Sequence, residues 1–176
     1  MAEALESKAL IEKNGMPVEI LSGGSTGTYN IDVAVLGFTE LQAGSYIFMD
    51  LDYRRIGNQA GTQFLDFDYA LSVLTTVISK CHLGLATVDG GTKAFSTDKP
   101  FVPELKGDPG VRFRWAGDEH GILELEGARR EIRLGDRLEF IPPHCDPTVN
   151  LYDFMYAVRE NRVEDIWPVE ARGLSQ

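Results

Sequence analysis

Apolar residues recur at helical spacing only near the start of the chain. Within residues 3–13, Leu5, Leu10 and Ile11 stand among Glu and Lys residues, and Asn14-Gly15 follows. Apolar positions three to four residues apart predict an amphipathic helix, and an Asn-Gly pair favours its C-terminal cap. We therefore expect one short helix here.

Short apolar segments joined by glycine-rich loops come next. Residues 17–21 predict a buried strand that runs into Ser-Gly-Gly-Ser-Thr-Gly-Thr-Tyr at residues 22–29. Residues 38–43 predict a second strand, which ends at the turn Gly-Ser-Tyr of residues 44–46. Helix, strand and glycine-rich loop in alternation are typical of the βα units of a parallel α/β fold. Residues 1–55 are therefore expected to belong to such a fold.

From residue 56 onward the pattern changes to short strands separated by turn signals. Beyond a loop rich in Gly, Pro, Asp and Lys at residues 97–110, strand candidates continue almost to the end of the chain. The predicted strands are residues 71–79, 83–89, 111–115, 121–125, 137–141, 154–159 and 163–167. This spacing predicts a mainly antiparallel β sandwich or barrel. We therefore place a domain boundary near residue 55, with a second domain over residues 56–176.

The composition restricts which binding partners and which cellular location are expected. The 176 residues are 43% apolar and 10% aromatic, which suffices for a packed core. The formal net charge of −10 argues against nucleic acid or an anionic membrane as a partner. Two cysteines, Cys81 and Cys145, make no disulfide framework, and the polar start is unlike a signal peptide. We therefore expect a cytoplasmic protein. Because no apolar run approaches the roughly 20 residues of a spanning helix, we also expect it to be soluble.

The two glycine-rich loops are candidates for binding phosphate. Glycines leave the backbone N–H groups unobstructed, and the interleaved Ser and Thr side chains add further donors. A flexible connection would explain either loop alone. Two such loops, each following a predicted strand, favour the phosphate interpretation.

The segment Pro-Pro-His-Cys-Asp-Pro-Thr-Val-Asn of residues 142–150 is a candidate metal site. Pro143 and Pro147 predict that the residues between them are extended, so that His144 and Asp146 share one face and Cys145 takes the other. An imidazole nitrogen and a carboxylate oxygen would then form half of a divalent-metal site. The alternative is a histidine at a strand end followed by a turn-forming Asp-Pro pair.

Two other polar stretches are less specific. Gly-Asp-Glu-His-Gly at residues 117–121 places three titratable groups between glycines, and the alternative is a solvated hairpin loop. Residues 89–94, Asp-Gly-Gly-Thr-Lys-Ala, are interpreted as another turn.

Four motifs in order resemble a known family. They are S-G-G-S-T-G-T at residues 22–28, T-E-L-Q-A-G-S-Y-x-F-M-D at 39–50, D-E-H-G at 118–121 and P-P-H-C-D-P-T-V-N at 142–150. Together they resemble the carboxy-terminal part of D-threonine aldolase and its relative D-serine dehydratase, pyridoxal-phosphate enzymes of the alanine-racemase-like fold type. The resemblance implies the last two βα units of a (β/α)₈ barrel over residues 1–55. A β domain carrying the metal site would follow over residues 56–176.

The same resemblance implies a set of site residues. It makes His144 and Asp146 the metal ligands and places His144 and Asp118 at the catalytic centre. A cysteine stands at the position of Asp146 in the dehydratase relatives, and a carboxylate suits Mn²⁺ or Mg²⁺ better than Zn²⁺, which favours the aldolase. The residues that would bind the pyridoxal 5′-phosphate are Gly23, Gly24, Ser25, Thr26, Gly27, Thr28, Gly44 and Ser45.

The activity implied is cleavage of a 3-hydroxy-D-amino acid to glycine and an aldehyde, which makes the protein a carbon–carbon lyase. A D-serine dehydratase-like ammonia-lyase, a non-catalytic remnant and a structural metal-binding β module stay open as alternatives.

The family's Schiff-base lysine is expected upstream of these motifs, because none of the lysines here lies in a matching context. We therefore expect this chain alone to be inactive. Its expected partners are a small-molecule substrate and either a second copy of itself or a missing amino-terminal barrel half.

Overall fold

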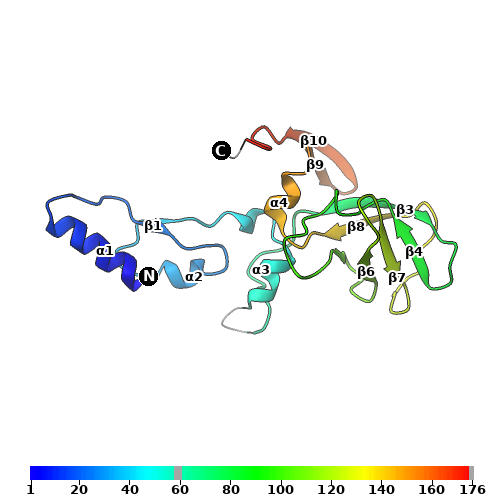
Figure 1. The fold of residues 1–176 in the computed structure, drawn as a ribbon, viewed down its shortest axis with the longest axis horizontal. Helices are drawn as coiled ribbons and strands as arrows, with labels where there is room; N and C mark the ends of the chain where they lie inside the picture. The colour runs from blue at the N-terminus through cyan, green and yellow to red at the C-terminus, as the bar shows by residue number, and fades with distance from the viewer. Residues whose placement is uncertain (58–60, 175–176) are drawn as a thin grey trace.

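The computed structural model describes residues 1–57 and 61–174. Its outline is elongated, with an amino-terminal part that extends away from a β domain (Figure 1). Residues 58–60, at the start of the second predicted domain, lie outside the described residues.

The amino-terminal part contains one regular helix and very short strands. Helix α1 (Ala2–Lys13) confirms the predicted helix, and Gly15 after it has a φ of 84°. Strand β1 (Ser22–Gly23) pairs in parallel with β2 (Glu40–Leu41), and α2 (Tyr29–Asp32) lies between them in the chain. The predicted strand at residues 17–21 is wrong, because the paired residues Ser22 and Gly23 lie beyond it, in the predicted glycine-rich loop. The predicted strand at residues 38–43 is wrong in extent, because only Glu40 and Leu41 of that segment pair with β1. A ladder this short does not by itself define a (β/α)₈ barrel.

Two short helical segments connect this part to the β domain. The 3₁₀ helix η1 (Ser45–Ile47) begins within the second glycine-rich loop. Helix α3 (Leu51–Ile56) has Asp50 as its N-cap, and the Asp50 carboxylate accepts a hydrogen bond from the N–H of Tyr53. This is a standard N-cap.

The β domain is built on one antiparallel sheet of six strands in the order β5-β8-β3-β4-β7-β6. Its strands are β3 (Val73–Ser79), β4 (Leu85–Val88), β5 (Glu104–Leu105), β6 (Arg112–Trp115), β7 (Gly121–Glu124) and β8 (Arg137–Ile141). The two edge strands, β5 and β6, contact each other, so the sheet curls into a nearly closed barrel. The predicted antiparallel β domain is confirmed, although β5 lies within the segment predicted as a loop.

Alternating side chains of these strands fill the barrel. Along β3, Val73, Thr75 and Val77 are buried while Leu74 is exposed, as expected for a strand with one face on the core. Phe113 and Phe140 meet edge to face with ring centroids 5.6 Å apart. Phe140 belongs to β8, so this packing fixes the strand that leads into the His-Cys-Asp segment.

Helix α4 (Cys145–Val149) and a hairpin follow the last strand of the barrel. Among the strands that the structure describes, β9 (Phe154–Arg159) and β10 (Arg162–Pro168) pair only with each other, outside the six-stranded sheet (Figure 1). Glu160 and Asn161 both have positive φ, as a tight two-residue turn requires. Every residue of β10 is exposed.

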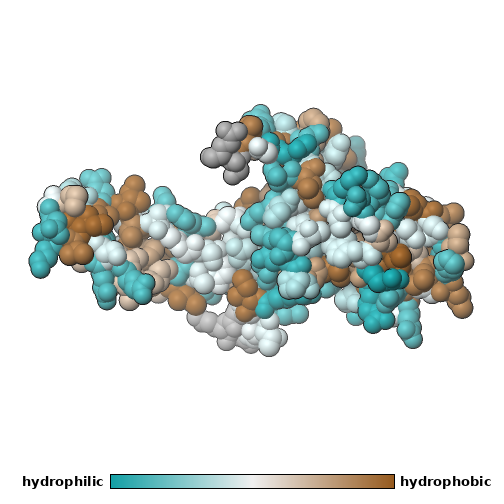
Figure 2. All heavy atoms as spheres, in the orientation of Figure 1, coloured by the Kyte–Doolittle hydropathy of each residue, from teal (hydrophilic) through white to brown (hydrophobic). Residues whose placement is uncertain are grey.

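Apolar side chains are also exposed in the amino-terminal part. Ile20, Val33 and Leu36 are exposed by 67%, 70% and 92%. Figure 2 shows apolar atoms gathered over this end of the molecule and again at the far end of the β domain. Within the described residues, no helix combines the length and the apolar character that crossing a membrane requires.

Candidate functional site

The candidate metal residues lie at the start of helix α4. His144 is the N-cap, with extended φ and ψ of −141° and 126°, and Cys145 and Asp146 are the first two helical residues. The predicted extended conformation is therefore wrong beyond His144. Pro147 is the third residue of the helix, where its missing N–H is not needed and its fixed φ already suits the helix.

His144 and Asp146 nevertheless converge. Nε2 of His144 lies 3.4 Å from Oδ2 of Asp146, whereas Cys145 is completely buried and its thiol donates to the other carboxylate oxygen of Asp146, Oδ1, over 3.3 Å. Burial raises the pKa of the Cys145 thiol well above its usual range, and the neighbouring carboxylates of Asp50 and Asp146 add to the effect. The thiol therefore stays protonated and is unsuited to bind a metal.

A segment of the β domain holds His144 in place. Its Nδ1 lies 2.7 Å from Oδ2 of Asp98, and its main-chain N–H donates to the Ser96 hydroxyl over 3.0 Å. Partial burial raises the pKa of Asp98, but the hydrogen bond and charge of His144 outweigh it, so the net pKa is below the usual range. The imidazole is thus fixed from both its ring and its backbone.

The separation of the two side chains fits a shared divalent cation. Two atoms each about 2.1 Å from one ion lie about 3.0 Å apart at a right angle and about 3.4 Å apart at a tetrahedral angle. The measured 3.4 Å between Nε2 and Oδ2 falls at this limit. Within residues 1–57 and 61–174, no cluster of three His, Cys, Asp or Glu side chains is placed to hold a metal ion. The pair therefore supplies two ligands, and the others would come from water or substrate.

The first glycine-rich loop is organised around Asp32. This carboxylate, only 3% exposed, accepts a hydrogen bond from the Thr28 hydroxyl, whose oxygen in turn accepts the N–H of Ser25 over 3.2 Å. Gly24 has a φ of +81°, and a Cβ there would lie 2.3 Å from Oδ2 of Asp32. Thr28 is therefore engaged within the loop and supports its shape.

The donors that a phosphate needs are present in the same loop. Among the described residues, the N–H groups of Gly24, Thr26 and Gly27 have no acceptor. The buried hydroxyl of Thr26 accepts the N–H of Tyr46 over 3.1 Å and so joins the first loop to the second. These free backbone donors fit a bound phosphate group.

The second glycine-rich loop contacts Asp146 of the candidate metal pair. The hydroxyl of Ser45 lies 3.4 and 3.5 Å from the two carboxylate oxygens of Asp146. The structure thus brings the loop residues Thr26 and Ser45 into one continuous set of contacts with His144 and Asp146.

In the described part of the chain, Asp118 is hydrogen-bonded to a different segment from the one that holds His144 and Asp146. It stands in the turn between β6 and β7, where its carboxylate accepts from the Thr92 hydroxyl over 3.4 Å and its main-chain carbonyl accepts the N–H of Lys93. Within the part of the chain that the structure describes, none of its hydrogen bonds or ion pairs joins it to His144 or Asp146. These contacts are those of the hairpin loop, and a catalytic role for Asp118 stays a prediction.

Sequence reasoning missed two carboxylates at the site. Asp98 belongs to the predicted loop of residues 97–110, and its Lys-Pro successor is the only local signal for an ordered turn. Asp50 is the last residue of the second family motif, and its position before an apolar helical residue is an N-cap signal in the sequence.

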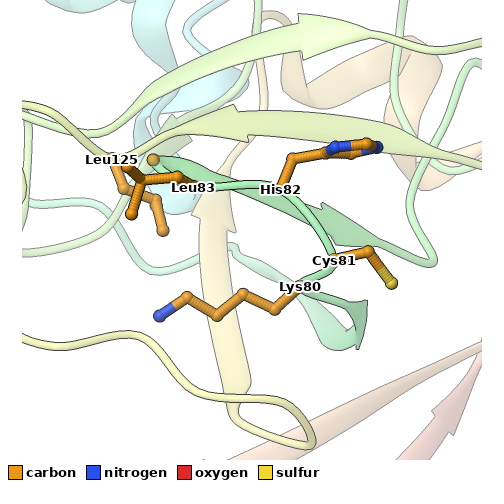
Figure 3. A pocket seen from close by; sticks show the side chains of 6 residues that line it. Lys80, Cys81, His82, Leu83 and Leu125 are labelled. Atoms are coloured by element: carbon orange, nitrogen blue, oxygen red, sulfur yellow. The ribbon is translucent and has the colours of Figure 1, made fainter.

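A separate surface hollow lies at the turn between β3 and β4. It has a volume of about 420 Å³ and is lined by Lys80, Cys81, His82, Leu83, Gly84 and Leu125. Figure 3 shows the thiol of Cys81 and the ring of His82 directed away from Leu83 and Leu125. The hollow shares no residue with the candidate site and has no carboxylate lining it.

Comparison with known proteins gives a consistent result. The family model described as the putative serine dehydratase domain matches residues 70–158. The 3-hydroxy-D-aspartate aldolase of Paracoccus denitrificans (strain Pd 1222) is 39% identical over 175 residues, which are 98% of this chain and 44% of that protein.

Solved structures match with similar coverage. The D-threonine aldolase from Filomicrobium marinum superposes with a TM-score of 0.90 at 36% identity, over 98% of this chain and 47% of that one. The D-threo-3-hydroxyaspartate dehydratase from Delftia sp. HT23 gives a TM-score of 0.77 at 31% identity, over 95% and 48%. A variant of a dehydratase of this name is known in a metal-free form. The chain spans about half the length of these relatives.

Proposed function

Because the chain belongs to the putative serine dehydratase domain family, we propose that it is the carboxy-terminal part of a lyase acting on 3-hydroxy-D-amino acids. The predicted resemblance to D-threonine aldolase is confirmed by the matched relatives. The reaction we propose is retro-aldol cleavage to glycine and an aldehyde, dependent on pyridoxal phosphate and a divalent metal, with Mn²⁺ preferred. Asp146, an oxygen ligand, favours this reaction over the dehydratase alternative.

One observation carries the proposal. The His144–Asp146 pair and the glycine-serine loops, which are separate in the sequence, adjoin through the contact between Ser45 and the Asp146 carboxylate. Metal-assisted chemistry on a cofactor-bound amino acid needs a cation site beside a phosphate anchor. A linker loop or a structural metal module would not require the cation site and the phosphate-binding loop to be adjacent.

Different residues of this chain bind the phosphate, shape the loops and bind the metal. The backbone N–H groups of Gly24, Thr26 and Gly27 bind the cofactor phosphate, helped by Gly44 and Ser45 of the second loop. Gly23, Ser25 and Thr28 maintain the shape of the first loop. Nε2 of His144 and the carboxylate of Asp146 bind the metal. When bound, the metal lowers the pKa of the substrate β-hydroxyl, and the cofactor takes up the electrons of the broken Cα–Cβ bond.

A chimaera tests the proposal. This chain would replace the matched carboxy-terminal 44% of the Paracoccus denitrificans aldolase, whose remaining part supplies the upstream half. With pyridoxal phosphate and Mn²⁺, we expect glycine release from D-threonine or 3-hydroxy-D-aspartate, and loss of that activity on Asp146→Ala. A folded chimaera that binds the cofactor but releases no glycine would refute the proposal.

The 176-residue chain alone is the negative control for this experiment. We expect it to release no glycine from either substrate under the same conditions, because it spans only about half of the relatives. A cytoplasmic location and assembly with a second copy or with a barrel half complete the proposal.

A further inference from the structure

We propose that Asp98 is a positioning residue that fixes the tautomer and orientation of the His144 imidazole, so that Nε2 presents its lone pair toward Asp146. The inference deepens the proposed function and rests on it for the identity of the metal site. It concerns a side chain in a segment for which the sequence predicted only a loop.

The two ring nitrogens of His144 face different carboxylates. Nδ1 lies 2.7 Å from Asp98 and Nε2 lies 3.4 Å from Asp146. A neutral imidazole carries one hydrogen, and an ionised carboxylate can only accept. The shorter contact therefore places the hydrogen on Nδ1 and leaves Nε2 as the unprotonated nitrogen that a metal requires.

The backbone around Asp98 is anchored to the same residue. Ser96, 3% exposed, accepts the N–H of His144 with its hydroxyl and donates its own N–H to the Thr148 hydroxyl over 3.0 Å. The Thr148 hydroxyl donates back to the carbonyl of His144 over 2.7 Å. The position of Asp98, two residues beyond Ser96, is thereby tied to the start of helix α4.

The other side of Asp98 is anchored as well. The adjacent Lys99 forms an ion pair of 2.6 Å with Asp52, and the N–H of Asp52 donates to the carbonyl of Pro143. Asp98 is therefore held between two segments that both contact the residues next to His144. Its side chain is 42% exposed, so these contacts of its neighbours position its backbone beside the imidazole.

Such a carboxylate has a measurable effect on a metal-binding histidine. It selects the tautomer, fixes the ring plane and strengthens the other nitrogen as a donor, and its loss typically weakens metal binding by about 10- to 100-fold. A purely structural contact would contribute to folding without changing which ring nitrogen carries the hydrogen.

The first experiment measures Mn²⁺ binding to the full chain by electron paramagnetic resonance of the free ion. We expect Asp98→Asn to raise the dissociation constant by about 10-fold or more. Glu131→Gln is the matched control, since it also removes one carboxylate charge from an exposed ion pair, here with Arg133. We expect this control to bind Mn²⁺ as the unmodified chain does, and thermal unfolding monitors the fold of each variant.

The second experiment reads the tautomer directly in the metal-free protein. The chain has only three histidines, so ¹⁵N chemical shifts of the ring nitrogens at a fixed pH near 8 can be assigned with a His144→Gln variant. We expect the Nδ1–H form for His144 in the unmodified chain, and a mixture containing the Nε2–H form in Asp98→Asn. Asp98→Glu, which keeps the charge, is expected to restore part of the original spectrum.

The outcomes separate this inference from the proposed function. If the unmodified chain and Asp146→Asn bind Mn²⁺ equally, the metal site is wrong, but the tautomer still tests Asp98. If Asp98→Asn leaves both the tautomer and Mn²⁺ affinity unchanged, the inference is overturned. If affinity falls while the tautomer is unchanged, Asp98 acts on the metal only through its negative charge, and the positioning role is also overturned.

Discussion

Oδ2 of Asp50 accepts a hydrogen bond from the N–H of Cys145 over 2.7 Å, although 95 residues separate the two positions in the chain. The other carboxylate oxygen of Asp50 accepts the N–H of Tyr53 at the start of helix α3. One fully buried carboxylate therefore caps α3 and holds the first residue of α4. It joins the segment after the second glycine-rich loop to the metal pair.

Asp50→Asn should destabilise the protein by about 1–3 kcal/mol, because the amide places an NH₂ group against a buried N–H that needs an acceptor. Urea unfolding followed by circular dichroism measures the change. Asp52→Asn is the control two residues away, where loss of a partly exposed ion pair with Lys99 should cost less than about 1 kcal/mol. Equal losses for the two variants would contradict the bridging role.

Asp146→Ala should abolish Mn²⁺ binding, whereas Cys145→Ala should change the dissociation constant by less than about twofold. The reason is that Asp146 faces Nε2 of His144 while the Cys145 thiol is buried and protonated. Isothermal titration calorimetry with Mn²⁺ distinguishes the two. If both variants lose binding equally, Asp146 is not the ligand that distinguishes the two side chains, and the assignment of the metal site is incorrect.

Gly24→Ala should cost about 1–3 kcal/mol of stability, because residue 24 has a φ of +81° and its new Cβ would collide with the Asp32 carboxylate. Gly44→Ala should be nearly neutral, since no atom lies within 4 Å of the added Cβ. Thermal unfolding compares them. A tolerated Gly24→Ala would show that the loop can adopt another shape.

Stability should fall at alkaline pH in a way that depends on Tyr152. Burial, with a contribution from Asp89, raises the pKa of Tyr152 to about 12, and its hydroxyl donates to the carbonyl of Ala94. The unfolded chain has an ordinary tyrosine pKa of about 10, so the folded state holds the proton more tightly. This stabilisation is complete below about pH 10 and is lost as pH rises through about 12.

Urea unfolding at pH 8 and pH 11 measures this effect. Between these two values the unmodified chain should lose about 1 kcal/mol more than Tyr152→Phe, in which the titrating group is absent. The comparison cancels the titration of all other groups. Equal losses in the two proteins would show that Tyr152 titrates normally in the folded state.

The isolated chain should self-associate. Ile20 and Ile47 are exposed by 67% and 54% in the amino-terminal part, and Trp167 by 50% in the projecting hairpin. Exposed apolar surface and unpaired strand edges favour contacts between molecules. Size-exclusion chromatography with light scattering should show the mean mass rising with concentration. A monomer across the whole concentration range would count against assembly with a second copy.

The secondary-structure elements that depend on neighbouring residues in the chain were predictable from the sequence. Helix α1 follows from apolar spacing and its Asn-Gly end, and the strands of the β domain follow from short alternating segments between turns. The identity of the candidate metal residues came from the family motif, because proline spacing alone was explained as well by a strand-end histidine followed by a turn-forming Asp-Pro pair, and favoured that alternative. The predicted extended backbone at Cys145 and Asp146 failed because local proline rules do not distinguish a strand from the first turn of a helix.

Local patterns in the chain were enough to predict a polar His-x-Asp segment, two glycine-rich loops and an antiparallel β domain. The distant groups that complete them became known from the packed fold: Asp98 beside His144, Asp50 beside the N–H of Cys145 and Ser45 beside Asp146. The physical reason is that spacing along the chain controls neighbours within one element. Contacts across about 50 to 100 residues are instead set by how the packed barrel and its connecting segments bring separate elements together.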